Sequence, residues 1–139
     1  MPESIDDPVL GRLNWDVELW GGSIEFRPGH RVDVFVGHEY DGGRPEEEIA
    51  LARRSLARIR EREPEYRLWS AMHLQGKRWN TEEAMTVEDI AELLQVATLE
   101  FAPDGATQIF WNDQDVLFGG HNVVTELDTT GKCVAAGMQ

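Results

Sequence analysis

The chain has 139 residues, of which 41% are hydrophobic, and its net charge at pH 7 is −13. This length is typical of one domain, which we expect to span residues 1–139, with a core that needs no disulfide or metal. Its one cysteine, Cys133, cannot form an internal disulfide, and the first residues do not resemble a signal peptide. No segment approaches the roughly 20 apolar residues of a membrane helix. We therefore expect a cytoplasmic protein that does not bind membranes.

The negative charge is concentrated in the second part of the chain. Residues 1–79 contain 15 acidic and 12 basic side chains, whereas residues 80–139 contain 11 acidic side chains and one basic residue, Lys132. Because phosphate backbones are bound by clustered Lys and Arg, this distribution argues against nucleic-acid binding. It permits a basic protein partner, although acidic surfaces also keep proteins soluble without any partner.

The first part of the chain shows the alternation of apolar and polar side chains that is typical of half-buried strands. Glycine and proline pairs between these segments predict tight turns. Together they predict a three-stranded antiparallel meander. Its strands are expected over residues 13–19, 23–26 and 32–36, and its turns at Gly21-Gly22 and Pro28-Gly29.

The middle of the chain predicts two to three helices. Pro45 suits the first turn of a helix, and an apolar stripe at helical spacing follows it. Pro64 is expected to start a second helix, with Tyr66, Trp69, Met72 and His73 on one face. Thr86 and Asp89 resemble the capping box of a third helix. The stripe of the first helix consists of Ile49, Ala52, Leu56 and Ile59.

The last third of the chain returns to strand signals, separated by turn residues. We expect a second antiparallel meander here. The order of meander, helices and meander predicts an α+β fold rather than a parallel α/β sheet. Whether the two meanders share one sheet is left open. The predicted strands lie around Leu99 and Phe101 and over residues 109–111, 116–118, 122–127 and 132–136, with turns at Pro103-Asp104-Gly105 and Asp128-Thr129-Thr130-Gly131.

Several segments at the two ends of the chain carry a resemblance to a known family. They are Asp7-Pro8-Val9-Leu10-Gly11 with Leu13 and Trp15, Gly120-His121, Glu126-Leu127-Asp128 with Gly131, and Ala136-Gly137. With these segments the chain resembles a bacterial family of uncharacterised domains, domain of unknown function 2262. The resemblance implies an uncharacterised bacterial α+β domain, with no established activity or catalytic residue to transfer. Some families of this kind look like immunity or partner-binding proteins, which is an analogy only.

The sequence contains no phosphate-binding loop, dinucleotide fingerprint, nucleophile elbow or zinc-binding helix, so we predict no cofactor and no metal. The best catalytic candidate is His121 after Gly119-Gly120, with Asp113 and Asp115 nearby in sequence. An imidazole and two carboxylates could form an acid–base site. The alternative is that the glycines form a bulge and both Asp residues belong to a solvated turn.

The other histidines and the cysteine give weaker signals. His38 is followed by Glu39 in a loop, which could bind a metal or share a proton, or simply be solvated. His30 follows a turn and is expected to be solvated, whereas His73 is expected to be partly buried. Cys133 has no adjacent base and predicts a structural thiol rather than a nucleophile.

Three aromatic residues are candidates for partner contacts. Strand alternation places Trp20 and Phe35 away from the valine-lined face, and Tyr40 lies in the next loop. Aromatic side chains are enriched at interface hot spots. The alternative is that a helix or loop covers this face and makes it a second layer of core.

These observations leave several functions open. The leading hypothesis is a non-enzymatic domain that binds a basic protein partner through its acidic second part, and an immunity-like role is one concrete form. The alternative is a small-molecule-binding domain or hydrolytic enzyme that uses His121, Asp113 and Asp115. A homodimer, formed through strand edges or through the face of Trp20 and Phe35, is a third hypothesis.

Overall fold

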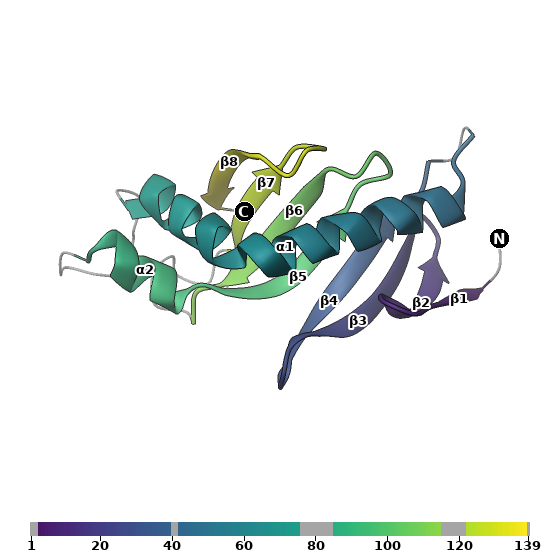
Figure 1. Cartoon of the computed structure of the whole chain (residues 1–139), viewed down its shortest axis with the longest axis horizontal. Helices are drawn as coiled ribbons and strands as arrows, with labels where there is room; N and C mark the ends of the chain where they lie inside the picture. Colours follow the sequence, from purple (N-terminus) through teal and green to yellow (C-terminus); the bar gives the residue numbers. More distant parts are fainter. Residues whose placement is uncertain (1–2, 40–41, 76–84, 115–121, 139) are drawn as a thin grey trace.

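The computed structural model describes residues 3–39, 42–75, 85–114 and 122–138. Its α+β architecture consists of strands before and after two helices (Figure 1). In chain order, the elements are β1 (Ser4–Asp7), β2 (Gly11–Asp16), β3 (Leu19–Arg27), β4 (His30–Gly37), α1 (Pro45–Leu74), α2 (Val87–Leu93), β5 (Gln95–Phe101), β6 (Thr107–Asn112), β7 (Val123–Leu127) and β8 (Cys133–Met138).

The eight strands of the described chain form one sheet in the order of the sequence. All neighbouring strands pair antiparallel except β4 and β5, which pair parallel. A parallel pair needs a crossover connection, and α1 with α2 supplies it. The two predicted meanders are therefore parts of one sheet. The N-terminal meander has one strand more than predicted, because β1 pairs with β2.

The turn between β2 and β3 lies earlier than predicted. β2 ends at Asp16 and β3 begins at Leu19, and Val17 between them has a φ of 57°, in the left-handed region. Gly21 and Gly22, predicted as the turn, lie inside β3. The prediction was wrong because apolar and polar residues keep alternating through the two-residue turn. Pattern alone does not show where such a chain reverses.

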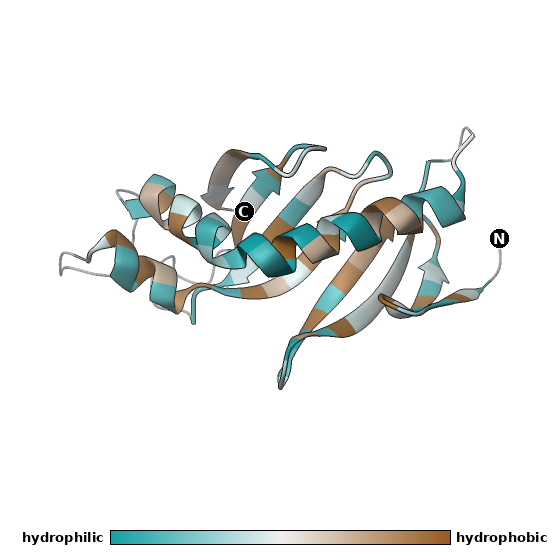
Figure 2. Ribbon diagram, viewed as in Figure 1, coloured by the Kyte–Doolittle hydropathy of each residue, from teal (hydrophilic) through white to brown (hydrophobic). Residues whose placement is uncertain are grey.

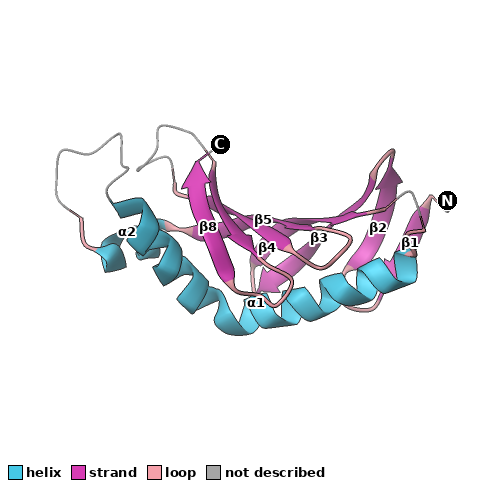
Figure 3. Ribbon diagram, turned by 90° about the horizontal axis from the view of Figure 1, so that it is seen from above, coloured by secondary structure: helices cyan, strands magenta, loops and turns pink. Residues whose placement is uncertain are grey.

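One helix of 30 residues, α1, replaces the two helices that were predicted before and after Pro64. Pro64 has no N–H to donate to the carbonyl of Arg60 four residues earlier. Arg27 Nη2 of β3 donates to that oxygen instead, at 2.6 Å. The carbonyl is thus satisfied by the neighbouring sheet, and α1 continues through Pro64 as a bowed helix (Figure 3).

The side chains that face inward in the last turns of α1 differ from those predicted. Tyr66 is in the core as predicted, but Met72 and His73 are exposed. Ser70 and Leu74 are buried instead, so the inward stripe continues from Tyr66 in steps of four residues. No helix in the described ranges is both long and apolar enough to cross a membrane.

The shorter elements agree with their turn and cap signals. Thr86 and Asp89 form both hydrogen bonds of a capping box at the start of α2. The predicted turns before Gly105 and Gly131 are present, and both glycines have a positive φ. The strand predicted over residues 116–118 lies outside the described residues.

The hydrophobic core lies between α1 and one face of the sheet (Figures 1 and 2). In Figure 3, α1 runs along this side, and no helix of the described chain covers the opposite side. Of the apolar residues in the strand predicted over residues 13–19, Leu13 is buried, whereas Val17 is 73% exposed. The apolar residues predicted to face inward on the next two strands, and the apolar stripe of the helix, are buried, with at most 5% of each residue exposed. They are Ile24, Phe26, Val32, Val34, Val36, Ile49, Ala52, Leu56 and Ile59.

A polar network crosses this core between the helix and the C-terminal strands. Trp111 Nε1 donates to Thr125 Oγ1 at 2.9 Å. The hydroxyl of Ser70 on α1 is hydrogen-bonded to Thr125 Oγ1 and also donates to the carbonyl of Tyr66. Since each polar group has a partner, the network fixes α1 against β6 and β7 without an unsatisfied donor.

Candidate functional site

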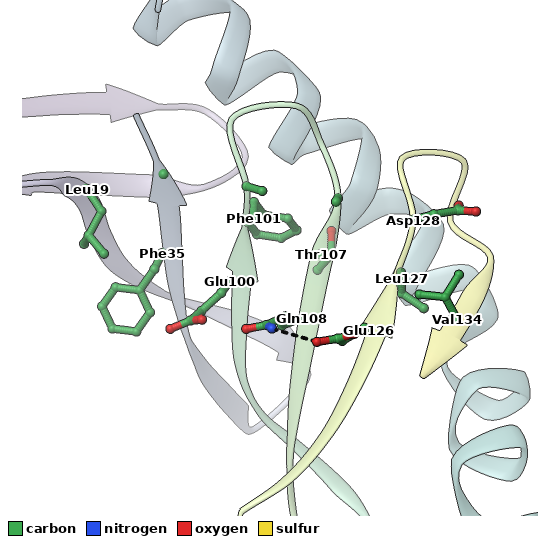
Figure 4. A pocket seen from close by; sticks show the side chains of 13 residues that line it. Leu19, Phe35, Glu100, Phe101, Thr107, Gln108, Glu126, Leu127, Asp128 and Val134 are labelled. Atoms are coloured by element: carbon green, nitrogen blue, oxygen red, sulfur yellow. Dashed lines mark hydrogen bonds between the residues drawn. The ribbon is translucent and has the colours of Figure 1, made fainter. Parts of the chain in front are cut away.

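The uncovered face of the sheet contains a cavity of about 520 Å³ (Figure 4). Residues of β3 to β8 and of the turns between them line it. Its walls are mainly apolar, with three carboxylates and one amide among them. The side chains that give it this character are Leu19, Phe35, Glu100, Gln108, Glu126, Asp128 and Val134.

Strand register places four of these side chains in one row. Phe35 of β4 lies opposite Glu100 of β5 in the parallel pair, Glu100 opposite Gln108 of β6, and Gln108 opposite Glu126 of β7. Figure 4 shows this row with α1 behind the sheet. Successive residues of a strand point to opposite faces. The core neighbours of these residues in sequence therefore face α1, and the row faces away from it.

The row carries negative charge that the cavity itself does not neutralise. Gln108 Nε2 donates to Glu126 Oε1 at 3.3 Å. Glu100 is half-buried, and no described residue forms a hydrogen bond or ion pair with its carboxylate. Among the described residues, the lining contains no Lys, Arg or His. A ligand that brings a positive charge would therefore meet carboxylates only.

Asp128 adds a third carboxylate at the edge of the cavity. Its Oδ1 accepts hydrogen bonds from Thr130 Oγ1 at 2.6 Å, from Thr130 N at 2.9 Å and from Lys132 N at 3.0 Å. The hydroxyl of Thr130, followed by the Lys132 N–H, holds the pKa of Asp128 below its usual value. This carboxylate is therefore ionised at neutral pH.

Gly21 gives the Phe35 ring its place at the edge of the cavity. The two residues lie opposite each other in the β3–β4 pair. A Cβ atom on Gly21 would lie 3.2 Å from Phe35 Cε1, which is closer than ordinary van der Waals contact. Because Gly21 has no side chain, the ring leans toward β3 and the space in front of Glu100 stays open.

The three aromatic candidates have different outcomes. Phe35 is on the uncovered face as predicted and lines the cavity. Trp20 is fully buried in the core opposite Val36, so its predicted place away from the valine-lined face was wrong. The reversal at Val17 is the reason, because alternation counted from β2 does not continue into β3. Tyr40 lies outside the described residues.

The structure leaves the predicted acid–base site open. Asp113 is 4% exposed just after β6 and has an interaction partner. His121 and Asp115 lie outside the described residues, so their convergence with Asp113 stays a prediction. The described residues contain no group of three or more His, Cys, Asp or Glu side chains that could hold a metal ion.

His38 meets a different carboxylate from the one next to it in sequence. Its Nδ1 lies 2.6 Å from Glu48 Oε1 on α1, and both side chains are 5% exposed. Glu48 Oε2 accepts the Glu39 N–H at 2.9 Å. The pair joins the end of β4 to the start of α1, and its burial suits a structural role.

The remaining histidines contact carbonyl groups. His30 Nε2 is 2.7 Å from the carbonyl oxygen of Val96, so His30 is partly buried rather than a solvated turn residue. His73 is exposed, stacks on Trp69 and is hydrogen-bonded to its carbonyl oxygen. Its predicted partial burial was wrong, because the buried stripe of α1 passes through Ser70 and Leu74 instead.

Cys133 has the properties of a structural thiol. It is partly buried against the core where β8 begins. Burial, with a smaller contribution from the Asp128 carboxylate, raises its pKa to about 11. A thiol with this pKa is almost entirely protonated at neutral pH and is therefore a weak nucleophile.

Sequence reasoning did not single out Glu100, Gln108 or Glu126. Alternation could have placed Glu100 between Leu99 and Phe101 on an outward face. It could not have aligned Glu100 with Phe35, because the two are brought together by the parallel pairing of β4 with β5.

The fold and cavity define an α+β domain with one helix-covered and one uncovered sheet face. The chain belongs to a bacterial family of uncharacterised proteins, domain of unknown function 2262, whose sequence profile matches residues 7–138. Neither the curated proteins nor the solved structures gave a significant match.

Proposed function

We propose that this chain is a non-enzymatic binding domain that takes a basic protein partner on the uncovered face of its sheet. The observation that carries the proposal is the cavity on this face, where apolar side chains lie beside carboxylates and no described lining residue is basic. Apolar contact supplies affinity at such a surface, and charge selects the partner.

The charge of the whole chain supports the same class of partner. The net charge is −13, so the field of the protein attracts cations and raises the association rate of a basic protein. An immunity-like role, in which the domain blocks a basic partner, is one concrete form of this function. It requires association that weakens as salt concentration rises.

The test uses the purified domain as bait in a bacterial lysate, with captured proteins identified by mass spectrometry and then purified. The matched baits are the wild type, the triple variant Phe35→Ala/Glu100→Gln/Glu126→Gln, and Asp33→Asn, which removes an exposed carboxylate outside the cavity lining. We expect to capture a basic protein that binds to the wild-type and Asp33→Asn baits but does not bind to the triple variant. Calorimetry at two salt concentrations then gives the affinity. Equal capture by all three baits, or only acidic partners, contradicts the proposal.

A small-molecule-binding domain is the second candidate, because the cavity of about 520 Å³ falls within the usual range for small-molecule sites. Under this alternative, the hydrolytic version would use His121 and Asp115 with Asp113. A ligand screen by thermal shift tests it. Stabilisation that the triple variant abolishes would favour this candidate over a protein partner.

A further inference from the structure

We propose that the cavity is a receptor for one lysine or arginine side chain of the partner, with Glu100 as the carboxylate that meets the cation. The inference rests on the proposed function and names the group that the uncovered face recognises. Three features support it: a carboxylate that no described residue donates to, apolar walls beside that carboxylate, and arginines on the same face that are bound to other groups.

The first feature is a half-buried carboxylate without a donor. Glu100 lies between Phe35 and Gln108 in the row, and no described residue donates to it. Glu126, at the same level, already accepts a hydrogen bond from Gln108. Removing a carboxylate from water is unfavourable unless a donor or cation compensates. An ammonium or guanidinium group supplies that compensation and gains a charge-assisted hydrogen bond.

The second feature is the shape of the apolar walls. The side chains of Leu19, Phe35 and Val134 line the cavity beside the carboxylates, as expected for a site that holds an alkyl stem behind a charged head. The ring of Phe35 next to Glu100 can also attract a cation through its face. A metal ion or a small inorganic cation would leave these apolar walls without contact.

The third feature is that the chain's own arginines on this face are engaged elsewhere. Arg31 Nη2 donates to the carbonyl and hydroxyl oxygens of Ser23, and Arg12 Nη2 donates to Ser4 Oγ. None of these residues lines the cavity. Lys132 favours the ionised form of Asp128 at the edge of the cavity, but no described basic side chain pairs with Glu100. A cation from another molecule can take this place. The surrounding face, which no described helix covers, leaves room for the protein that carries it.

The test titrates the ¹⁵N-labelled domain with three small probes and follows amide shifts by NMR. The probes are Nα-acetyl-lysine methylamide, Nα-acetyl-arginine methylamide and the uncharged Nα-acetyl-norleucine methylamide. We expect the two charged probes to shift the signals of Phe35, Glu100, Gln108 and Glu126, and the norleucine probe to bind about tenfold more weakly. Equal binding of the norleucine probe overturns the inference.

Variants separate a specific site from general attraction by an acidic protein. Glu100→Gln should raise the Kd of the charged probes about tenfold, whereas Asp33→Asn on the same face should change it less than about twofold. Gly21→Ala, which moves the Phe35 ring toward the cavity, should also weaken binding while leaving the charges unchanged. Circular dichroism confirms that each variant is folded. Equal effects of Glu100→Gln and Asp33→Asn overturn the inference.

Two further outcomes distinguish this inference from the proposed function. If Glu100→Gln binds the captured basic protein as tightly as the wild type does, the partner-binding function stands and the receptor site is wrong. If no basic protein is captured, the proposed function fails. Spermidine is a further probe. If it binds one-to-one and more tightly than either charged probe, the cavity is a site for free polyamines, and the inference that a partner's side chain occupies it is overturned.

Discussion

The two faces of the sheet differ in what covers them and therefore in what their residues do. Along β5, Leu99 is fully buried against the helical side, whereas its neighbour Glu100 points into the cavity on the other side. Along β4, Val34 and Val36 are buried and Phe35 between them lines the cavity. Changes on the covered face should therefore lower stability, and changes on the uncovered face should alter binding.

The largest expected effect is the loss of stability when a core side chain on the covered face is truncated. Leu99→Ala removes a fully buried side chain, so we expect the free energy of unfolding to fall by about 2–5 kcal/mol. Glu100→Gln, one residue away on the other face, should change it by less than about 0.5 kcal/mol. Urea unfolding followed by circular dichroism measures both. A loss of similar size in the two variants would show that the faces do not differ in this way.

The polar network in the core should be the next most sensitive feature. Thr125→Val keeps the shape of the side chain but removes the hydroxyl that pairs with Trp111 Nε1 and Ser70 Oγ. We expect a loss of about 1–3 kcal/mol, because buried donors are left without partners. Thr98→Val is the matched control, since Thr98 lies on the uncovered face and forms no side-chain hydrogen bond with the described residues. A stable Thr125→Val variant would contradict the role of the network.

A smaller effect is expected where the sheet supports α1 at Pro64. Arg27→Gln removes the donor to the Arg60 carbonyl, and we expect it to lower the free energy of unfolding by about 1 kcal/mol. In the Pro64→Ala variant, residue 64 regains an N–H that can donate to the Arg60 carbonyl. Arg27→Gln should therefore lower the free energy of unfolding less in that variant than in the wild type. The double-mutant cycle measures this coupling. Additive effects of the two changes would show that Arg27 does not compensate for Pro64.

The smallest effect concerns the two sides of β8. Burial raises the pKa of Cys133 to about 11, so at pH 8 its alkylation by iodoacetamide should be at least about tenfold slower in the folded chain than in urea. The control is Cys133→Ser/Val134→Cys, which moves the thiol to a position that is 56% exposed on the other side of the strand. Its thiol should react at nearly the unfolded rate. Equal alkylation rates in the folded wild type and the folded control would contradict the expected difference between the two sides of β8.

The same thiol gives stability a defined pH dependence. The folded chain holds the thiol proton to a higher pH than the unfolded chain, because burial disfavours the thiolate. Stability should therefore fall as pH rises from the usual thiol pKa toward about 11. At lower pH both states are protonated, and Cys133 contributes no pH dependence. Cys133→Ser should lack this part of the decline.

Local patterns were enough to predict many elements of the fold. The valine strand of β4, the apolar stripe of α1 and the capping box of α2 depend on residues within a few positions of one another. Two predictions failed, one because of a distant residue and one because of a nearby turn. Pro64 does not end α1, because Arg27 satisfies the carbonyl that the proline leaves without its donor. Trp20 is buried because the chain reverses at Val17.

The candidate site was predicted less completely than the fold. Phe35 was placed on the correct face, because alternation within β4 is local. Its partners in the row were missed, although each also alternates within its own strand. The row exists because β4 and β5, which α1 and α2 separate in the sequence, pair side by side in the sheet.

The sequence by itself determined the α+β class, the acidic character and the faces of β4, since composition and alternation depend only on the order of residues. Tertiary structure decided that the strands form one sheet, that α1 covers a single face and that Glu100 lies beside Phe35 without a donor among the described residues. These features depend on strand register across the crossover. Register is set by packing between segments far apart in the chain.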